Sequence, residues 1–85
     1  MNNIERLKKK IVYRSEYRGI KEMDLLLSSF VKKYLNDFSI VELKQLYYLL
    51  NIDDDNLFKW YLNRQCKIKI PKNKVSNLLK KFKLK

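Results

Sequence analysis

The sequence predicts an all-α fold, a compact five-helix bundle that forms a single small domain over residues 1–85. The chain contains one glycine and one proline, which leaves little of the turn chemistry that a multi-stranded sheet needs. Apolar residues recur at helical spacing, and residue pairs typical of helix N-termini separate the periodic stretches. A chain of this length has room for one modest core, because small domains bury only about 60–65% of their unfolded surface.

The first two helices follow from apolar periodicity. The first is predicted over residues 3–17, ending near Gly19, with an apolar side formed by Ile4, Leu7, Ile11, Tyr13 and Tyr17. The second has one continuous apolar face, made by Met23, Leu26, Leu27, Phe30, Val31 and Tyr34. Glu22 and Asp24 in its first turn, and Lys32 and Lys33 in its last, complement the helix dipole.

Capping signals introduce the remaining helices. Ser39 stands three residues before Glu42, the capping-box spacing in which each side chain bonds the other's backbone N–H. The aspartates at 53–55 are expected to cap a short fourth helix rather than to bind a cation, because they lack the spacing of a calcium loop. A fifth helix follows Pro71. The inward-facing residues are predicted to be Leu43, Leu46, Tyr47, Leu50, Leu57, Trp60, Tyr61, Val75, Leu78, Leu79 and Phe82.

The composition argues against an enzyme. The chain has no histidine and one cysteine, so neither a transition-metal site nor a nucleophile with its usual base is expected. No glycine-rich loop is present to hold a nucleotide phosphate, and no apolar run approaches the roughly 20 residues of a membrane span. Cys66 is expected to be an incidental thiol. With no signal-peptide or transit-peptide pattern, the sequence predicts a soluble, bacterial, cytoplasmic protein.

The net charge of +11 is concentrated at the two ends of the chain. Residues 1–18 have a net charge of +4, residues 19–63 of −2, and residues 64–85 of +9. The basic C-terminal segment is open to several interpretations: a solvated lysine face, a surface for an acidic protein partner, or a site for nucleic acid or an anionic membrane. Its single arginine, Arg64, and its few aromatic residues argue against specific nucleic-acid recognition.

The only glycine of the chain lies between oppositely charged residues where a helix begins, in the run Arg18-Gly19-Ile20-Lys21-Glu22. One interpretation is a helix boundary, with Gly19 as connector and Glu22 placed to suit the helix dipole. The other is a docking patch, because glycine permits positive φ and lets a second backbone approach closely. Arg18 and Glu22 would then make charge-assisted hydrogen bonds to a partner.

The chain resembles the small succinate dehydrogenase assembly factors, also called flavinylation factors. Their hallmark R-G-x-x-E is present as Arg18, Gly19 and Glu22, and the upstream Y-x-S-x-x-R-G pattern includes Tyr13 and Ser15. A second block, residues 55–60, is similar to the family's acidic-Leu-aromatic-x-Trp signature. The resemblance covers residues 11–63 and implies a five-helix bundle, in agreement with the periodicity.

The resemblance also implies a function. The expected partner is the flavoprotein subunit of succinate dehydrogenase, or of its relative fumarate reductase, and the expected role is to promote covalent attachment of FAD to a histidine of that subunit. FAD would be carried by the partner, and this chain is predicted to bind no cofactor and to be a monomer. The implied partner-binding residues are Arg18, Gly19 and Glu22, with Tyr17, Lys21 and Asp24 as neighbours of the contact. An antitoxin-like regulatory role remains an alternative.

Overall fold

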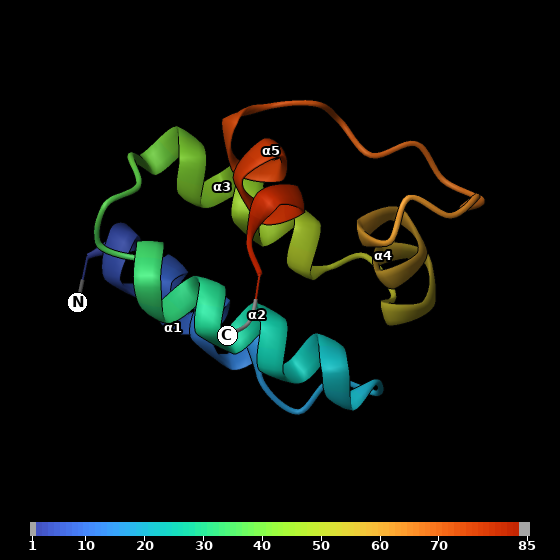
Figure 1. The fold of residues 1–85 in the computed structure, drawn as a ribbon. Coiled ribbons are helices and arrows are strands. Elements are labelled where there is room, and N and C mark those ends of the chain that lie inside the picture. The colour runs from blue at the N-terminus through green and yellow to red at the C-terminus, as the bar shows by residue number, and fades with distance from the viewer. Residues whose placement is uncertain (1, 84–85) are drawn as a thin grey trace.

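The computed structural model describes residues 2–83 and contains five α-helices (Figure 1). They are α1 (Asn3–Ser15), α2 (Lys21–Tyr34), α3 (Ile40–Leu50), α4 (Asp54–Tyr61) and α5 (Lys74–Lys81). The described part of the chain contains no strand, so the predicted all-α class is confirmed. α1 and α2 lie side by side, α3 packs against both α1 and α5, and a long loop leads from α4 over the molecule to α5.

One apolar core joins all five helices. α2 contributes its whole predicted face to this core except Tyr34, which is half-buried. The other helices add fewer residues each, and Phe38, Ile52 and Ile70 add apolar side chains from the connections. The remaining buried core residues are Ile11, Leu43, Leu46, Leu49, Leu50, Leu57, Val75 and Leu79.

The predicted caps are confirmed. Ser39 and Glu42 form a capping box at the start of α3, and Asp53 caps α4 by accepting a hydrogen bond from the backbone N–H of Asn56. A second capping box, formed by Asn73 and Ser76, begins α5 and was not predicted. These local hydrogen bonds satisfy N–H groups that have no partner within their own helix.

Two expectations about α1 are wrong. α1 ends at Ser15 rather than near residue 17, and three residues expected on its apolar side are exposed: Ile4, Tyr13 and Tyr17. The early end has a backbone cause, because Tyr17 adopts a left-handed conformation with φ of 57° that cannot continue a right-handed helix. Trp60, which was predicted to face inward, packs against the core but is only half-buried. The Lys80 ammonium lies 4.7 Å from its ring centre.

Within residues 2–83, none of the helices combines the length and the apolar character needed to cross a membrane. The longest, α2, has 14 residues and carries charged side chains at both ends.

Candidate functional site

The candidate site is built around the ion pair of Arg18 and Asp54. Arg18 lies in the α1–α2 connection and Asp54 at the start of α4, and the Arg18 Nε donates to Asp54 Oδ1 over 2.6 Å. The two side chains are 9% and 15% exposed, so the pair is largely shielded from water. Charge-assisted hydrogen bonds of this kind are stronger than neutral ones, and here one joins residues 36 positions apart.

Both members of the pair have further partners on the backbone. The Arg18 guanidinium donates to the carbonyl oxygens of Arg14, Leu50 and Ile52, at 2.9, 2.7 and 2.9 Å. Four of the five N–H donors of Arg18 are therefore used within the chain. The second oxygen of Asp54 accepts from the backbone N–H groups of Gly19, at 2.5 Å, and Ile20, at 3.2 Å.

These contacts gather the ends of four helices. The guanidinium donates to carbonyl oxygens at the C-terminal ends of α1 and α3, where the helix dipole places partial negative charge. The Asp54 carboxylate lies at the N-terminal ends of α2 and α4, where the dipole is positive. Ile20, the N-cap of α2, has no side-chain cap, and Asp54 accepts from the backbone N–H of Ile20 and of Gly19 just before the helix begins. The pair therefore holds the α1–α2 connection against the α3–α4 connection.

Gly19 is needed for space rather than for an unusual backbone conformation. Its φ is not positive, but a Cβ at this position would lie 3.2 Å from Asp54 Oδ2, closer than ordinary van der Waals contact. In this connection the positive φ is at Tyr17. The group that lies close to Gly19 is a carboxylate of the same chain, and the approach of a partner's backbone stays a prediction.

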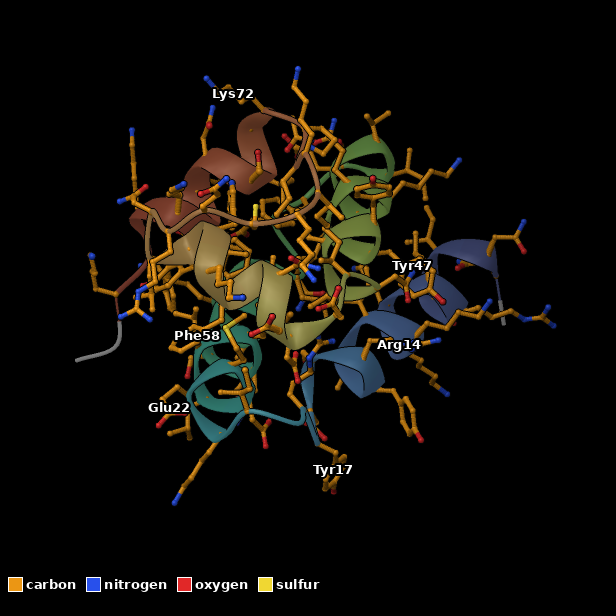
Figure 2. The ribbon with its side chains drawn as sticks, turned by 90° about the vertical axis from the view of Figure 1, so that its right-hand side faces the viewer. Arg14, Tyr17, Glu22, Tyr47, Phe58 and Lys72 are labelled. Atoms are coloured by element: carbon orange, nitrogen blue, oxygen red, sulfur yellow. The ribbon has the colours of Figure 1, made fainter. Side chains whose placement is uncertain are left out.

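The outer side of the same connection is open to solvent. Tyr17 is 85% exposed and Tyr13 is 73% exposed, and both line a groove of about 340 Å³ together with Arg14, Glu16, Arg18, Gly19 and residues 50–54. Figure 2 shows Tyr17 projecting away from the body of the molecule, with Glu22 at the same end. The groove thus has a polar floor made by the ion pair and an aromatic edge.

The structure separates the six predicted contact residues into two groups. Tyr17, Gly19, Lys21 and Glu22 are exposed, and Asp24 is half-buried in the first turn of α2. Arg18, in contrast, points inward and is occupied by intramolecular partners. The geometry therefore gives Arg18 the role of holding the connection, and its predicted hydrogen bond to a partner stays a prediction.

Asp54 is the site residue that the sequence did not reveal. The three consecutive aspartates have three different roles: Asp53 caps α4, Asp54 pairs with Arg18, and Asp55 forms a surface pair with Lys59 at 3.0 Å. A helix needs only one N-cap side chain, so the two additional aspartates were the sequence signal that one of them has another partner. Hydrogen bonds from the Asn56 side chain and backbone lower the pKa of Asp53 below its ordinary value.

None of residues 64–83 lines this groove. Lys80 and Lys83 rest over the rings of Trp60 and Tyr61, and Lys74 pairs with Glu42 at 3.0 Å. The pKa of Glu42 is lowered mainly by the backbone hydrogen bond from Ser39 and also by Lys74. Within residues 2–83, no three side chains of the types His, Cys, Asp and Glu come together as a metal site.

The chain is similar to eukaryotic proteins named succinate dehydrogenase assembly factor 2, mitochondrial. It is 34% identical to the protein from Dictyostelium discoideum over 94% of this chain and 55% of that protein. The protein from Scheffersomyces stipitis is 47% identical over 60% of this chain and 34% of the relative. The form named 2-A from Drosophila mojavensis is 42% identical over 71% and 40%. The chain thus spans about half or less of the length of these relatives, and no solved structure matches it.

These names correct one prediction. The relatives come from eukaryotes and are named mitochondrial, so the expectation of a bacterial, cytoplasmic protein is wrong. That expectation was based on the lack of a signal-peptide or transit-peptide pattern in the sequence, and the lack of such a pattern does not identify a cellular compartment. The names describe assembly factors rather than enzymes, in agreement with the composition.

A family model extends the similarity beyond the motifs that carried the resemblance. The model described as "Flavinator of succinate dehydrogenase" matches residues 9–83, whereas the motifs lie within residues 11–63. The match includes α2, α3, α4 and α5 in full, about half of α1, and much of the lysine-rich segment. The chain therefore belongs to the family described as the flavinator of succinate dehydrogenase.

Proposed function

We propose that this chain is a mitochondrial assembly factor that binds the flavoprotein subunit of succinate dehydrogenase and promotes covalent attachment of FAD to it. The observation that carries the proposal is the family match over residues 9–83, whose description names this role. The absence of histidine from the chain supports a division of labour in which both FAD and the acceptor side chain belong to the partner. Fumarate reductase, as a relative of that enzyme, is a second client to test.

The contact surface that we propose is the outer side of the α1–α2 connection and the first turn of α2. Tyr17 is its exposed aromatic anchor, and tyrosine is enriched among the residues that dominate binding energy at interfaces. Lys21 and Glu22, both exposed, add charges of opposite sign beside it. Arg18 and Asp54 hold this surface from inside, so little conformational entropy is lost when the partner binds.

The contribution to flavin attachment is positional. Docking on a surface that is already ordered would hold the flavoprotein in a conformation where its acceptor side chain meets the flavin in a productive orientation. Orientation of two reacting groups lowers a barrier through entropy and needs no catalytic residue from this chain. We further propose that the chain acts as a monomer, which light scattering of the purified protein would test.

Covalent flavin on the cognate flavoprotein tests this function. The subunit is expressed in cells that lack an endogenous factor, together with the wild-type chain, Glu22→Ala, Glu5→Ala or no factor, and flavin is read as in-gel fluorescence after denaturation. Glu5 is a matched control, because it is an exposed acid in the first turn of α1 as Glu22 is in that of α2. Wild type and Glu5→Ala should restore the signal, and Glu22→Ala should lower it. Equal fluorescence in all four samples would refute the proposal.

A further inference from the structure

A second groove lies on α3, away from the Arg18–Asp54 site. It has a volume of about 340 Å³ and is lined by Val41, Lys44, Gln45, Tyr48, Pro71 and Asn73. Four of these residues come from α3, and two come from the loop that leads into α5. Figure 2 shows Lys72, which stands between Pro71 and Asn73 in the chain, at the opposite end of the molecule from Tyr17.

The walls of this groove are mostly apolar and open to solvent. Val41 is 60% exposed and Tyr48 is 54% exposed, although both belong to a helix whose other face is buried in the core. The volume is at the lower end of the range for small binding pockets, roughly 300–1,000 Å³. The groove therefore has room for an apolar side chain of a short segment, but not for a folded element.

Gln45 is the lining residue with an unsatisfied polar atom. Its Oε1 is buried and has no hydrogen-bond partner among the described residues. A buried polar atom without a partner is uncommon and costs about 1–3 kcal/mol. The chain itself encloses this oxygen, so an occupant of the groove would be held by the apolar walls and by the surrounding charge.

The charge around the groove is positive. Lys44 lines it, and Lys72 is an exposed neighbour of two further lining residues. Residues 64–83 contain no acid, and the nearby Glu42 is already paired with Lys74. An occupant with carboxylates beside its apolar residue would complement this charge.

We infer that this groove binds a segment of a protein partner in which an apolar residue is flanked by acidic residues. The apolar walls favour a peptide over nucleic acid, because Tyr48 is the only aromatic ring among the lining residues and single strands are bound by stacking their bases on several rings. An anionic membrane would use the lysines but would not need the groove. The inference does not depend on the proposed function in flavin attachment.

The test uses a capped synthetic peptide with paired leucines between aspartates, and the same peptide with asparagines in place of the aspartates. Binding to the full chain is measured by calorimetry, and the occupied site is located by NMR from the side-chain amide of Gln45 and the methyl groups of Val41. The variant Val41→Glu places a negative charge in the groove at a position that is exposed, so the fold should be retained. Tyr17→Ala, at the opposite end of the molecule, is the control.

The wild-type chain and Tyr17→Ala should bind the aspartate peptide equally, with shifts at Gln45 and Val41. The asparagine peptide should bind about threefold more weakly, and Val41→Glu should lose about tenfold in affinity or more, because like charges then meet in the groove. Absence of binding, or equal binding by Val41→Glu, would overturn the inference. If vesicles of phosphatidylserine or a single-stranded oligonucleotide bind while the peptide does not, the lysines serve an anionic surface and the inference is also wrong.

Discussion

Replacing Asp54 with alanine is predicted to lower the free energy of unfolding by about 3 kcal/mol. The carboxylate accepts hydrogen bonds from Arg18 Nε and from the backbone of Gly19 and Ile20, and alanine removes all of them. Breaking a buried ion pair by removing one partner costs about 3–5 kcal/mol. The lower end applies here, because Arg18 keeps its carbonyl acceptors and Asp54 is 15% exposed.

This loss is a large part of the stability of so small a domain. At about 0.05–0.15 kcal/mol per residue, the chain is stabilised by roughly 4–13 kcal/mol in total. With an m value of about 1–1.5 kcal/mol per molar urea, the unfolding midpoint of Asp54→Ala should fall by about 2–3 M. Urea titrations followed by Trp60 fluorescence and by far-UV circular dichroism measure this midpoint with two independent probes.

The neighbouring residue provides the control. Asp55 also lies in the first turn of α4, but its ion pair with Lys59 is on the surface, with side-chain exposures of 69% and 40%. Exposed pairs of this spacing contribute about 0.3–0.5 kcal/mol, so Asp55→Ala should barely move the midpoint. If Asp54→Ala and Asp55→Ala have the same midpoint, the proposed role of the Arg18–Asp54 pair is wrong.

Three further predictions concern stability. Gly19→Ala should cost about 1 kcal/mol, because its Cβ would crowd Asp54 Oδ2 at 3.2 Å; an unchanged melting temperature would show that the carboxylate moves freely. The pKa values of Glu42 and Asp53 are lowered in the folded chain, so the stability they contribute is present above their unfolded pKa values and is lost as the pH falls below about 4. The melting temperature of the wild-type chain should therefore drop over that pH range, and the melting temperature of Glu42→Gln should drop less. If both melting temperatures fall equally steeply with pH, the Glu42 carboxylate does not contribute to the acid sensitivity. Trp60→Ala should cost about 2 kcal/mol and leave a folded protein, since the ring is only half-buried; a calorimetric scan without a transition would show that it is essential to the core.

Features that depend on neighbouring residues were predictable from the sequence. α2 and α3 follow from apolar spacing and from the Ser39–Glu42 capping box, both of which act within a few residues. The end of α1 was not predictable in this way. Tyrosine has no special preference for positive φ, so nothing in the local sequence indicates that Tyr17 turns the chain there.

The sequence predicts which residues of the α1–α2 connection lie together, but not the ion pair that holds them. Arg18, Gly19 and Glu22 are close in sequence, so their gathering at one end of the molecule follows from the chain itself. The partner of Arg18 lies 36 residues away, and the sequence alone does not distinguish Asp54 from the aspartates on either side. Whether a charged side chain faces a partner or the interior depends on such long-range packing, which periodicity does not encode.

The central claim is that the outer side of the α1–α2 connection promotes flavin attachment, and covalent flavin formed by a Tyr17→Ala variant tests it most directly. Because Tyr17 is 85% exposed, the variant should unfold at the same urea concentration as the wild-type chain. If the Tyr17 ring contributes about 1.4 kcal/mol to the binding free energy, its loss weakens binding to the flavoprotein about tenfold. When the concentration of this chain limits the reaction, the yield of covalent flavin on the purified flavoprotein should then fall by about tenfold. A yield equal to that of the wild-type chain would contradict the account.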